Sequence, residues 1–188
     1  MTFFKSLNLT AFVILMAFSL SACTDGSQSQ NHDHADHANH MESAAPTQTS
    51  TAETDIPKEQ AQKILVAYLQ LKDALVLTNG EAASQAAIKL VETLGSEEDE
   101  LLKNIRFDVE HIAETQDLGH QRDHFNNLSD NVYAMLKATE ANENPVYRQY
   151  CPMAFEGKGG YWLATEKEVN NPYFGDKMLH CGSVKEEL

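Results

Sequence analysis

The stretch "KILVAYLQLKDAL", Lys63 to Leu75, decides the fold class, because its apolar residues recur every three or four positions. They are Ile64, Leu65, Tyr68, Leu69, Leu71 and Leu75. This spacing predicts a helix with one buried face. Pro57 suits the opening turn of that helix, and Asn79-Gly80 predicts its end.

Two segments with the same period follow. The second helix is expected to stop at Gly95, and the third to begin with Ser96 as its N-cap. Acidic residues in the first turn of the third helix suit the helix dipole. They are Glu97, Glu98 and Asp99. The apolar stripes are Ala83, Ala87, Leu90, Val91 and Leu94 in the second helix, and Leu101, Leu102, Ile105, Val109 and Ile112 in the third.

A fourth helix is predicted to start near Asp117. Its apolar stripe is Phe125, Leu128, Val132, Met135 and Leu136. Short connections between helices of similar length favour antiparallel neighbours. The sequence therefore predicts an all-α fold, with an up-down four-helix bundle over residues 56–141.

The last segment, residues 142–188, loses the helical period and becomes aromatic and glycine-bearing. "VYRQY" and "YWLA" are β-prone runs on either side of "FEGKGG", which predicts a hairpin, and "NPYFG" predicts a tight turn. The segment is too short to fold alone. We expect an irregular, partly β-hairpin C-terminal tail, which contains Cys and Met residues and packs on the bundle.

Residues 1–22 have the layout of a secretory signal: an early lysine, an apolar run and small residues before Cys23. "LSAC" resembles the bacterial lipobox, which predicts lipidation of Cys23 by acyl chains such as palmitate; a plain signal peptide that ends in Cys is the alternative. A lipidated Cys23 would anchor the protein to a membrane without spanning it. Thr24 favours the outer membrane, facing the periplasm.

Residues 23–55 are polar and nearly free of apolar side chains, which predicts a disordered tether. Four histidines interleave with aspartates in its "HDHADHANH" tract: His32, His34, His37 and His40. Neutral imidazoles bind Zn and Cu(II) well, so this His tract is a secondary metal-binding candidate. The alternative is a solvated linker that binds metal only incidentally.

The net charge of -14 and the pI near 4.8 argue against nucleic acid as a partner. No nucleotide-binding loop and no hydrolase or metalloprotease motif occurs in the sequence, so we expect no enzyme. Three histidines fall in the helical part: His111, His120 and His124. We expect His124 to be a hydrogen-bonded histidine at the edge of the core, and we assign no di-iron centre or haem here.

Soft donor atoms gather in two short clusters of the tail. They are Cys151, Met153, Met178, His180 and Cys181. Thiolate and thioether sulfur select Cu(I) and Ag(I), so these residues are the main metal-site candidates. In an oxidising compartment, two cysteines can instead form a disulfide; here it would close a loop of about 30 residues, worth about 3 kcal/mol. The methionines would then be packing residues.

"YCPMA", "GGYWLA", "NPYFGDKML" and "CG" resemble the end of a bacterial exported domain of unknown function. That domain is also found on periplasmic adaptors of the copper and silver efflux type (CusB-like), and "HIAETQDLGHQRDHFNNLS" resembles its helices. The resemblance implies an α-helical domain with a Cys/Met tail and an association with heavy-metal handling. The chain departs from the expected pattern at Ala164 and His180.

Two functions remain open from the sequence. The first is a bacterial lipoprotein of the cell envelope that binds Cu(I) or Ag(I) for sequestration or hand-over, with efflux or copper-handling envelope proteins as partners. The second is a non-metal protein-interaction module in which a Cys151-Cys181 disulfide is structural.

Overall fold

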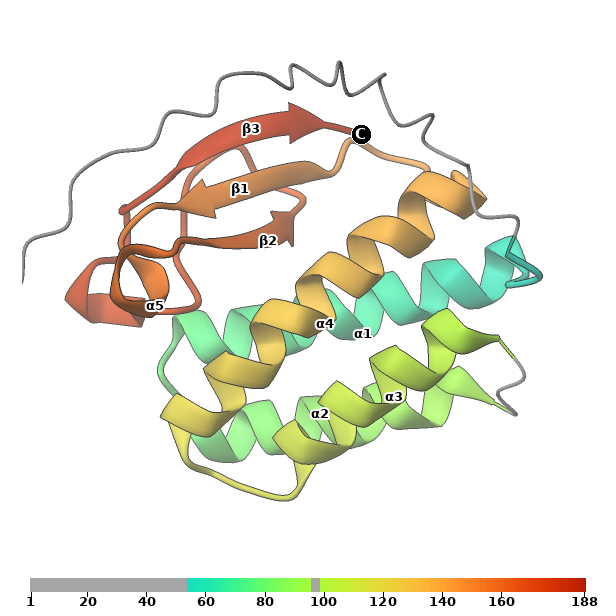
Figure 1. Ribbon diagram of the computed structural model, residues 1–188, viewed down its shortest axis with the longest axis horizontal. Coiled ribbons are helices and arrows are strands. Elements are labelled where there is room, and N and C mark those ends of the chain that lie inside the picture. Colours follow the sequence, from blue (N-terminus) through green and yellow to red (C-terminus); the bar gives the residue numbers. More distant parts are fainter. Residues whose placement is uncertain (1–53, 96–98) are drawn as a thin grey trace, which may run out of the picture. The chain divides into compact units, whose positions relative to one another are not determined.

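The computed structural model describes residues 54–95 and 99–188 (Figure 1). The predicted signal peptide, Cys23 and the His tract lie outside the described residues. The elements are α1 Lys58–Val76, α2 Gly80–Leu94, α3 Glu100–Ala113, α4 Leu118–Thr139, β1 Tyr147–Cys151, α5 Ala154–Gly157, β2 Gly160–Ala164, the 3-10 turn η1 Gly175–Lys177 and β3 Ser183–Glu187.

The four long helices predicted from the sequence are present. Each packs against the next along the chain, and α1 also packs against α4. Every predicted stripe supplies core residues, among them Ile64, Leu90, Ile105 and Leu128, which are fully buried. No helix within the described ranges is long and apolar enough to cross a membrane.

The chain between α1 and α2 has a role that the sequence did not predict. The helix α1 ends at Val76, and the backbone N–H of Asn79 donates to the carbonyl oxygen of Ala74 at 3.0 Å just after it. The side chain of Asn79 also caps the next helix, because it accepts a hydrogen bond from the N–H of Ala82 at 3.0 Å. Gly80 is the first residue of α2, where a Cβ atom would collide with the carbonyl oxygen of Gln116. Asn79-Gly80 thus follows the end of α1, as predicted, and also starts α2, which the sequence did not predict.

The start of α3 is also corrected. The predicted cap Ser96 lies outside the described residues, and the described helix is capped by Asp99, whose carboxylate accepts from the N–H groups of Leu101 and Leu102 at 2.8 and 3.3 Å. Thr54 donates its hydroxyl to the other oxygen of Asp99 at 2.7 Å. Asp117 caps α4 as the sequence predicts.

The predicted hairpin is confirmed, and the C-terminal segment contains a third strand that the sequence did not predict. Strands β1 and β2 pair antiparallel, with Arg148 opposite Leu163, and β3 pairs antiparallel with the other edge of β1. The result is a three-stranded sheet. β3, "SVKEE", escaped prediction because it is a short, charged and mostly exposed edge strand without alternating apolar residues.

Tyr68 joins the sheet to the helices. Its buried ring stacks on Phe125 of α4 at 5.1 Å, its hydroxyl lies 2.8 Å from the hydroxyl of Ser129, and it accepts the N–H of Leu163 at 3.1 Å. Burial raises the pKa of Tyr68 well above its ordinary range, so the phenol stays protonated. Figure 1 shows the sheet on the side of α1 and α4 that faces away from α2 and α3.

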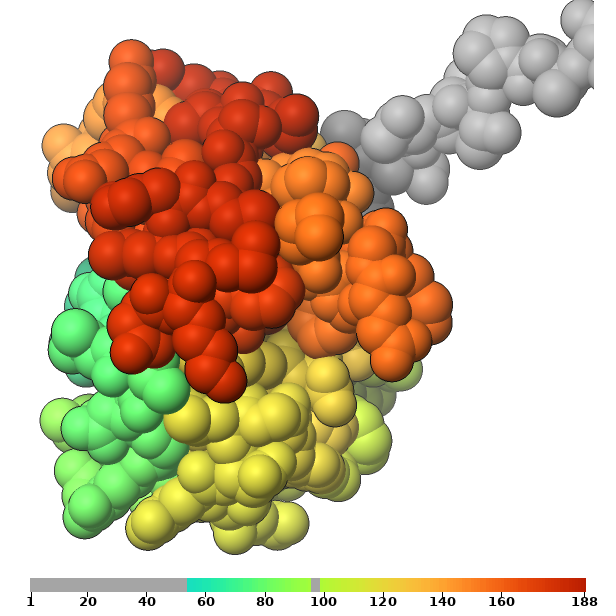
Figure 2. All heavy atoms as spheres, turned by 90° about the vertical axis from the view of Figure 1, so that its left-hand side faces the viewer, coloured from blue at the N-terminus to red at the C-terminus, as the bar shows by residue number. Residues whose placement is uncertain are grey.

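Two cationic side chains fix the loops around the sheet. Lys72 of α1 is buried, and its ammonium lies 2.6 Å from the carboxylate of Glu166, just after β2. Arg122 of α4 donates to the carbonyl oxygens of Pro172 and Leu75, at 2.8 and 3.3 Å. Figure 2 shows the orange and red C-terminal segment lying against the green and yellow ends of the helices.

Candidate soft-metal and redox site

The sheet brings two distant cysteines together. Cys151 is the last residue of β1, and Cys181 lies two residues before β3. Because β3 runs antiparallel to β1, with Tyr150 opposite Ser183, the two cysteines meet at the same end of the strands. Their Sγ atoms are 2.9 Å apart, and both residues are free thiols.

The two thiols differ in exposure. Cys151 is fully buried and belongs to the hydrophobic core, whereas Cys181 is partly exposed. The hydrogen bond to Cys151, together with burial, raises the pKa of Cys181, although a backbone N–H bond from Met153 opposes this. Cys181 is therefore a neutral thiol near pH 7. A metal ion that binds it as thiolate must displace its proton.

Asn171 positions Cys181. It is buried, its side-chain N–H donates to the carbonyl oxygen of Cys181 at 2.8 Å, and its side-chain oxygen accepts the N–H of Tyr173 at 2.8 Å. Its own backbone N–H donates to the carbonyl of Leu179 at 2.8 Å. The sequence indicated the "NPYFG" turn, but gave no sign that the turn's first residue holds the cysteine backbone.

Gly182 allows the chain beside Cys181 to lie flat on the sheet. Its φ is +147°, and a Cβ atom there would come within 2.8 Å of the carbonyl oxygen of Tyr150 and 3.0 Å of the indole of Trp162. Any larger residue therefore requires the backbone or its neighbours to shift at the position next to Cys181.

The other three predicted ligands lie within three residues of one of the two cysteines in sequence. Met153 and Met178 are 55% and 36% exposed. The carbonyl oxygen of Met178 accepts the N–H of Cys181 at 3.0 Å. His180 donates Nδ1–H to the carbonyl of Val169 at 2.8 Å, which leaves Nε2 with the lone pair.

Oxygen, nitrogen and thiol donors do not form a ready-made metal centre in the structure. Within residues 54–95 and 99–188, no group of three or more His, Cys, Asp or Glu side chains is arranged to hold an ion. The cysteine pair supplies two donors, and any further ligand would come from another side chain. The exposed side chains of Met153, Met178 and His180 are the nearest such donors in sequence.

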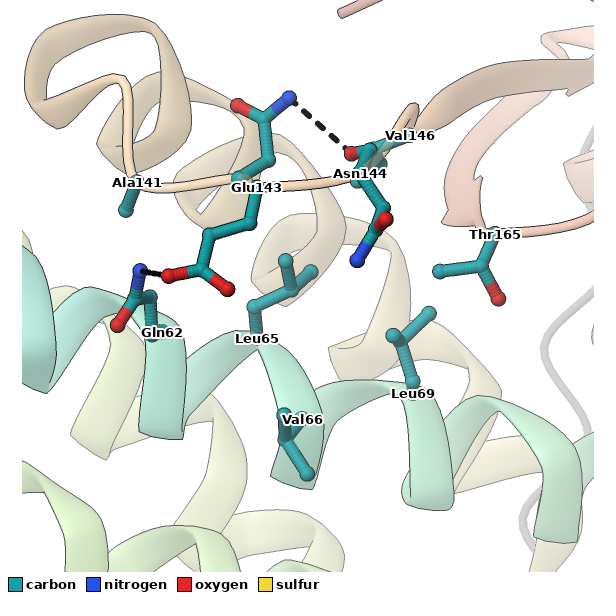
Figure 3. A pocket seen from close by; sticks show the side chains of 10 residues that line it. Gln62, Leu65, Val66, Leu69, Ala141, Glu143, Asn144, Val146 and Thr165 are labelled. Carbon is teal, nitrogen blue, oxygen red and sulfur yellow. Dashed lines mark hydrogen bonds between the residues drawn. The ribbon is translucent and has the colours of Figure 1, made fainter.

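A pocket of about 340 Å³ lies elsewhere, between α1 and the chain that leads from α4 to β1 (Figure 3). Leu65, Val66 and Leu69 form its apolar floor, and Gln62 donates to Glu143 at its rim at 3.1 Å. None of the predicted metal ligands lines it. Its chemistry suits an apolar group better than a metal ion.

His124 is a hydrogen-bonded boundary histidine, as expected. Its side chain is 17% exposed, and its Nδ1 lies 3.0 Å from a carboxylate oxygen of the buried Asp108. His111 from α3 stacks on it, with ring centroids 4.5 Å apart. From the sequence, His124 could be related only to His120, which lies four residues before it on the same helix. The contact with His111 depends on how the chain folds at the α3–α4 turn.

Comparison with known proteins supports one part of the resemblance. Residues 64–144 match a family described as "Protein of unknown function (DUF3347)". The matched residues run from α1 to the loop before β1, so they include the histidines of α3 and α4 but neither cysteine. No curated protein and no solved structure matches the chain. The helical part is therefore similar to a domain of unknown function.

Proposed function

We propose that this protein binds a soft heavy-metal ion, Cu(I) or Ag(I), and sequesters it or hands it to another protein of the bacterial cell envelope. The contact between Cys151 and Cys181 carries the proposal, because it joins two sulfurs that are 30 residues apart in sequence. Two thiolates form a linear or bent site that suits a d10 ion, and soft sulfur donors select such ions over hard cations.

The surroundings of the pair support ion entry from one side. Cys151 is closed off by the core, so an ion reaches the sulfurs past the partly exposed Cys181. Met153 and Met178 carry flexible thioethers at the surface, and His180 presents Nε2. These groups offer weaker, exchangeable ligands of the kind that a hand-over site needs.

We place this activity at the outer membrane, facing the periplasm, with the chain anchored through Cys23. The "LSAC" lipobox supports the anchor, and the "YCPMA" to "CG" motifs support an association with copper or silver efflux proteins. The His tract would add Zn or Cu(II) capacity. We also propose an up-down arrangement of the four helices, which the short connections between them favour. The proposal includes no catalytic step.

The decisive experiment is an anaerobic Cu(I) titration of the reduced full chain in detergent against a competing chelator. The four histidines of the His tract are changed to Gln, so that they cannot mask the result. Cys151→Ser/Cys181→Ser should abolish tight binding, because hydroxyls hold a soft ion poorly. Met153→Leu and Met178→Leu should weaken it less, and Met135→Leu, a buried helical control, should not change it.

Equal Cu(I) affinity in the parent and the double-serine chain would refute the metal function. The anchor is tested separately. Cys23→Ser should move the protein out of the membrane fraction, and unchanged membrane association after this substitution would refute lipidation.

The second candidate function is a protein-interaction module with a structural Cys151-Cys181 disulfide. Full burial of Cys151 in the core favours it, since structural cysteines are typically buried. The apolar pocket at Leu65 and Leu69 would then be a docking surface. Alkylation and mass spectrometry of the chain taken from the envelope separate the two candidates: a fully oxidised pair that resists reduction favours the module.

A further inference from the structure

Three imidazoles from two helices form a cluster at the α3–α4 turn. His111 lies in the last turn of α3, and His120 and His124 lie in the first two turns of α4. The ring centroid of His124 is 4.5 Å from that of His111 and 4.7 Å from that of His120. The centroids of His111 and His120 are 6.2 Å apart. None of these residues belongs to the cysteine site.

Two of the rings make the hydrogen bond that the non-ligating nitrogen of a metal-binding histidine makes. The Nδ1 atom of His111 lies 2.8 Å from the carbonyl oxygen of Phe107, and that of His124 lies 3.0 Å from the carboxylate of Asp108. Both partners accept, so each Nδ1 carries the proton and each Nε2 keeps its lone pair. A histidine that ligates a metal typically donates its other N–H to a carbonyl or a carboxylate in this way.

Asp108 is built into the fold beneath the cluster. It is buried on α3, and its second oxygen accepts a hydrogen bond from the side chain of Asn131 of α4 at 3.5 Å. A buried carboxylate is costly unless it is satisfied. Here its two partners, His124 and Asn131, both come from α4, and so the carboxylate fixes the imidazole of His124 relative to both helices.

The third ring is free to turn. His120 is exposed, and its backbone N–H is occupied by the side chain of the cap Asp117 at 2.8 Å. It lies four residues before His124, a spacing that places both rings on one face of α4. Phe107, 58% exposed, lies with its ring 4.4 Å from that of His111 and forms an apolar wall beside the cluster.

We propose that the Nε2 atoms of His111, His120 and His124 bind one Zn²⁺ ion at the surface between α3 and α4. Three neutral imidazoles and a water molecule form a tetrahedral site of the kind that zinc accepts. The described residues contain no group already arranged around an ion, so binding requires side-chain rotation of His120 and an opening of the stack between His111 and His124. The helices already hold the three residues within reach.

Zinc titration of the full chain tests this site. The background carries Cys151→Ser, Cys181→Ser and Gln at the four positions of the His tract, and Zn²⁺ is measured against a chromophoric chelator. One variant combines His111→Asn and His124→Asn, because the amide of Asn can replace the Nδ1–H donor but lacks Nε2. This double variant and the single variant His120→Gln should each lose one equivalent of tightly bound Zn²⁺. Asp108→Asn should weaken binding by about 10- to 100-fold.

Asn127→Gln is the matched control, since this residue is exposed on the same helix, α4, but lies outside the cluster. It should keep the Zn²⁺ equivalent. Zn²⁺ should also raise the melting temperature of the background chain and not that of His120→Gln, because a ligand of the native state stabilises it.

Equal Zn²⁺ stoichiometry and affinity in the background chain and in the His111/His120/His124 variants would overturn the site. So would a melting temperature that rises equally with Zn²⁺ in all of them. The cysteine proposal stands apart from this result, because the cysteines are already serine in every zinc experiment.

Discussion

The helices and the C-terminal segment, residues 142–188, hold their structure in different ways. Asn79, Asp99 and Asp117 cap their helices through N–H groups only two or three residues away. The C-terminal segment is held by partners on the helices 50 to 95 residues away in sequence, through Tyr68, Lys72 and Arg122. The cysteine site thus depends on the helices, whereas the helices carry their own signals.

The largest expected effect comes from Tyr68, where both regions meet. Tyr68→Ala removes a buried aromatic ring and the acceptor for the Leu163 N–H, and should lower the free energy of unfolding by about 3–5 kcal/mol. Urea denaturation followed by circular dichroism measures this. Tyr68→Phe, which keeps the ring, should cost about 1–3 kcal/mol. A Tyr68→Ala chain as stable as Tyr68→Phe would show that ring packing does not couple the regions.

Asn171→Ala should disturb the cysteine site and leave the helices intact. It removes the donor to Cys181 and the acceptor for Tyr173, and should cost about 1–3 kcal/mol. The buried thiol of Cys151 should react faster with a thiol reagent, while the helical circular dichroism signal stays unchanged. Asn142→Ala, at an exposed hydrogen bond, is the control. Loss of helix together with faster thiol reaction would contradict the proposed independence of the helices.

Asn79→Ala tests a local signal. Loss of the cap on α2 should lower stability by about 1 kcal/mol, and Asn79→Ser should restore most of it. Thermal melting gives the stability. The cap belongs to the helices and not to the C-terminal segment, so the rate of Cys151 alkylation in the native state should not change. A marked increase would mean that the structure of the cysteine site depends on this helix cap.

The smallest effect is expected at Glu186 of β3. The hydroxyl of Tyr133 donates to its carboxylate at 2.8 Å and, with Lys137, lowers its pKa against the opposing effect of burial. A lowered pKa stabilises the fold above the unfolded value of about 4.3, and this stabilisation fades as the pH falls through the folded value. The melting temperature should therefore fall less steeply between about pH 6 and about pH 3 for Glu186→Gln than for the parent. If the melting temperatures of both chains fall equally with pH, Glu186 does not contribute to the contacts that hold β3.

The contrast between local helix signals and long-range contacts also explains which parts of the fold the sequence could predict. Apolar periodicity located all four helices, and the β-prone runs around "FEGKGG" located β1 and β2. The capping roles of Asn79 and Asp99 were missed because stop and start signals overlap where helices follow closely. β3, the buried Asn171 and the position of His111 depend on contacts between distant segments, and no local pattern encodes such contacts.

For the candidate site, the sequence predicted which atoms are soft and offered Cys151 and Cys181 as a pair, but it did not show what brings them together. Cys151 and Cys181 are brought together by the pairing of β1 with β3, a strand that was not foreseen. Met153, Met178 and His180 share the chemistry but lie on exposed turns. Spacing along the chain therefore identified candidates, and the sheet register selected two of them.

The late position of β3 has a consequence for the time order of folding. The helices can form from local contacts as soon as they are made, but the β1–β3 pair closes only after its last residues are available. During the export that we propose, Cys151 would be without its partner while the 30 residues up to Cys181 emerge. In an oxidising compartment that interval favours mixed disulfides between chains, so production of this protein should benefit from a disulfide isomerase.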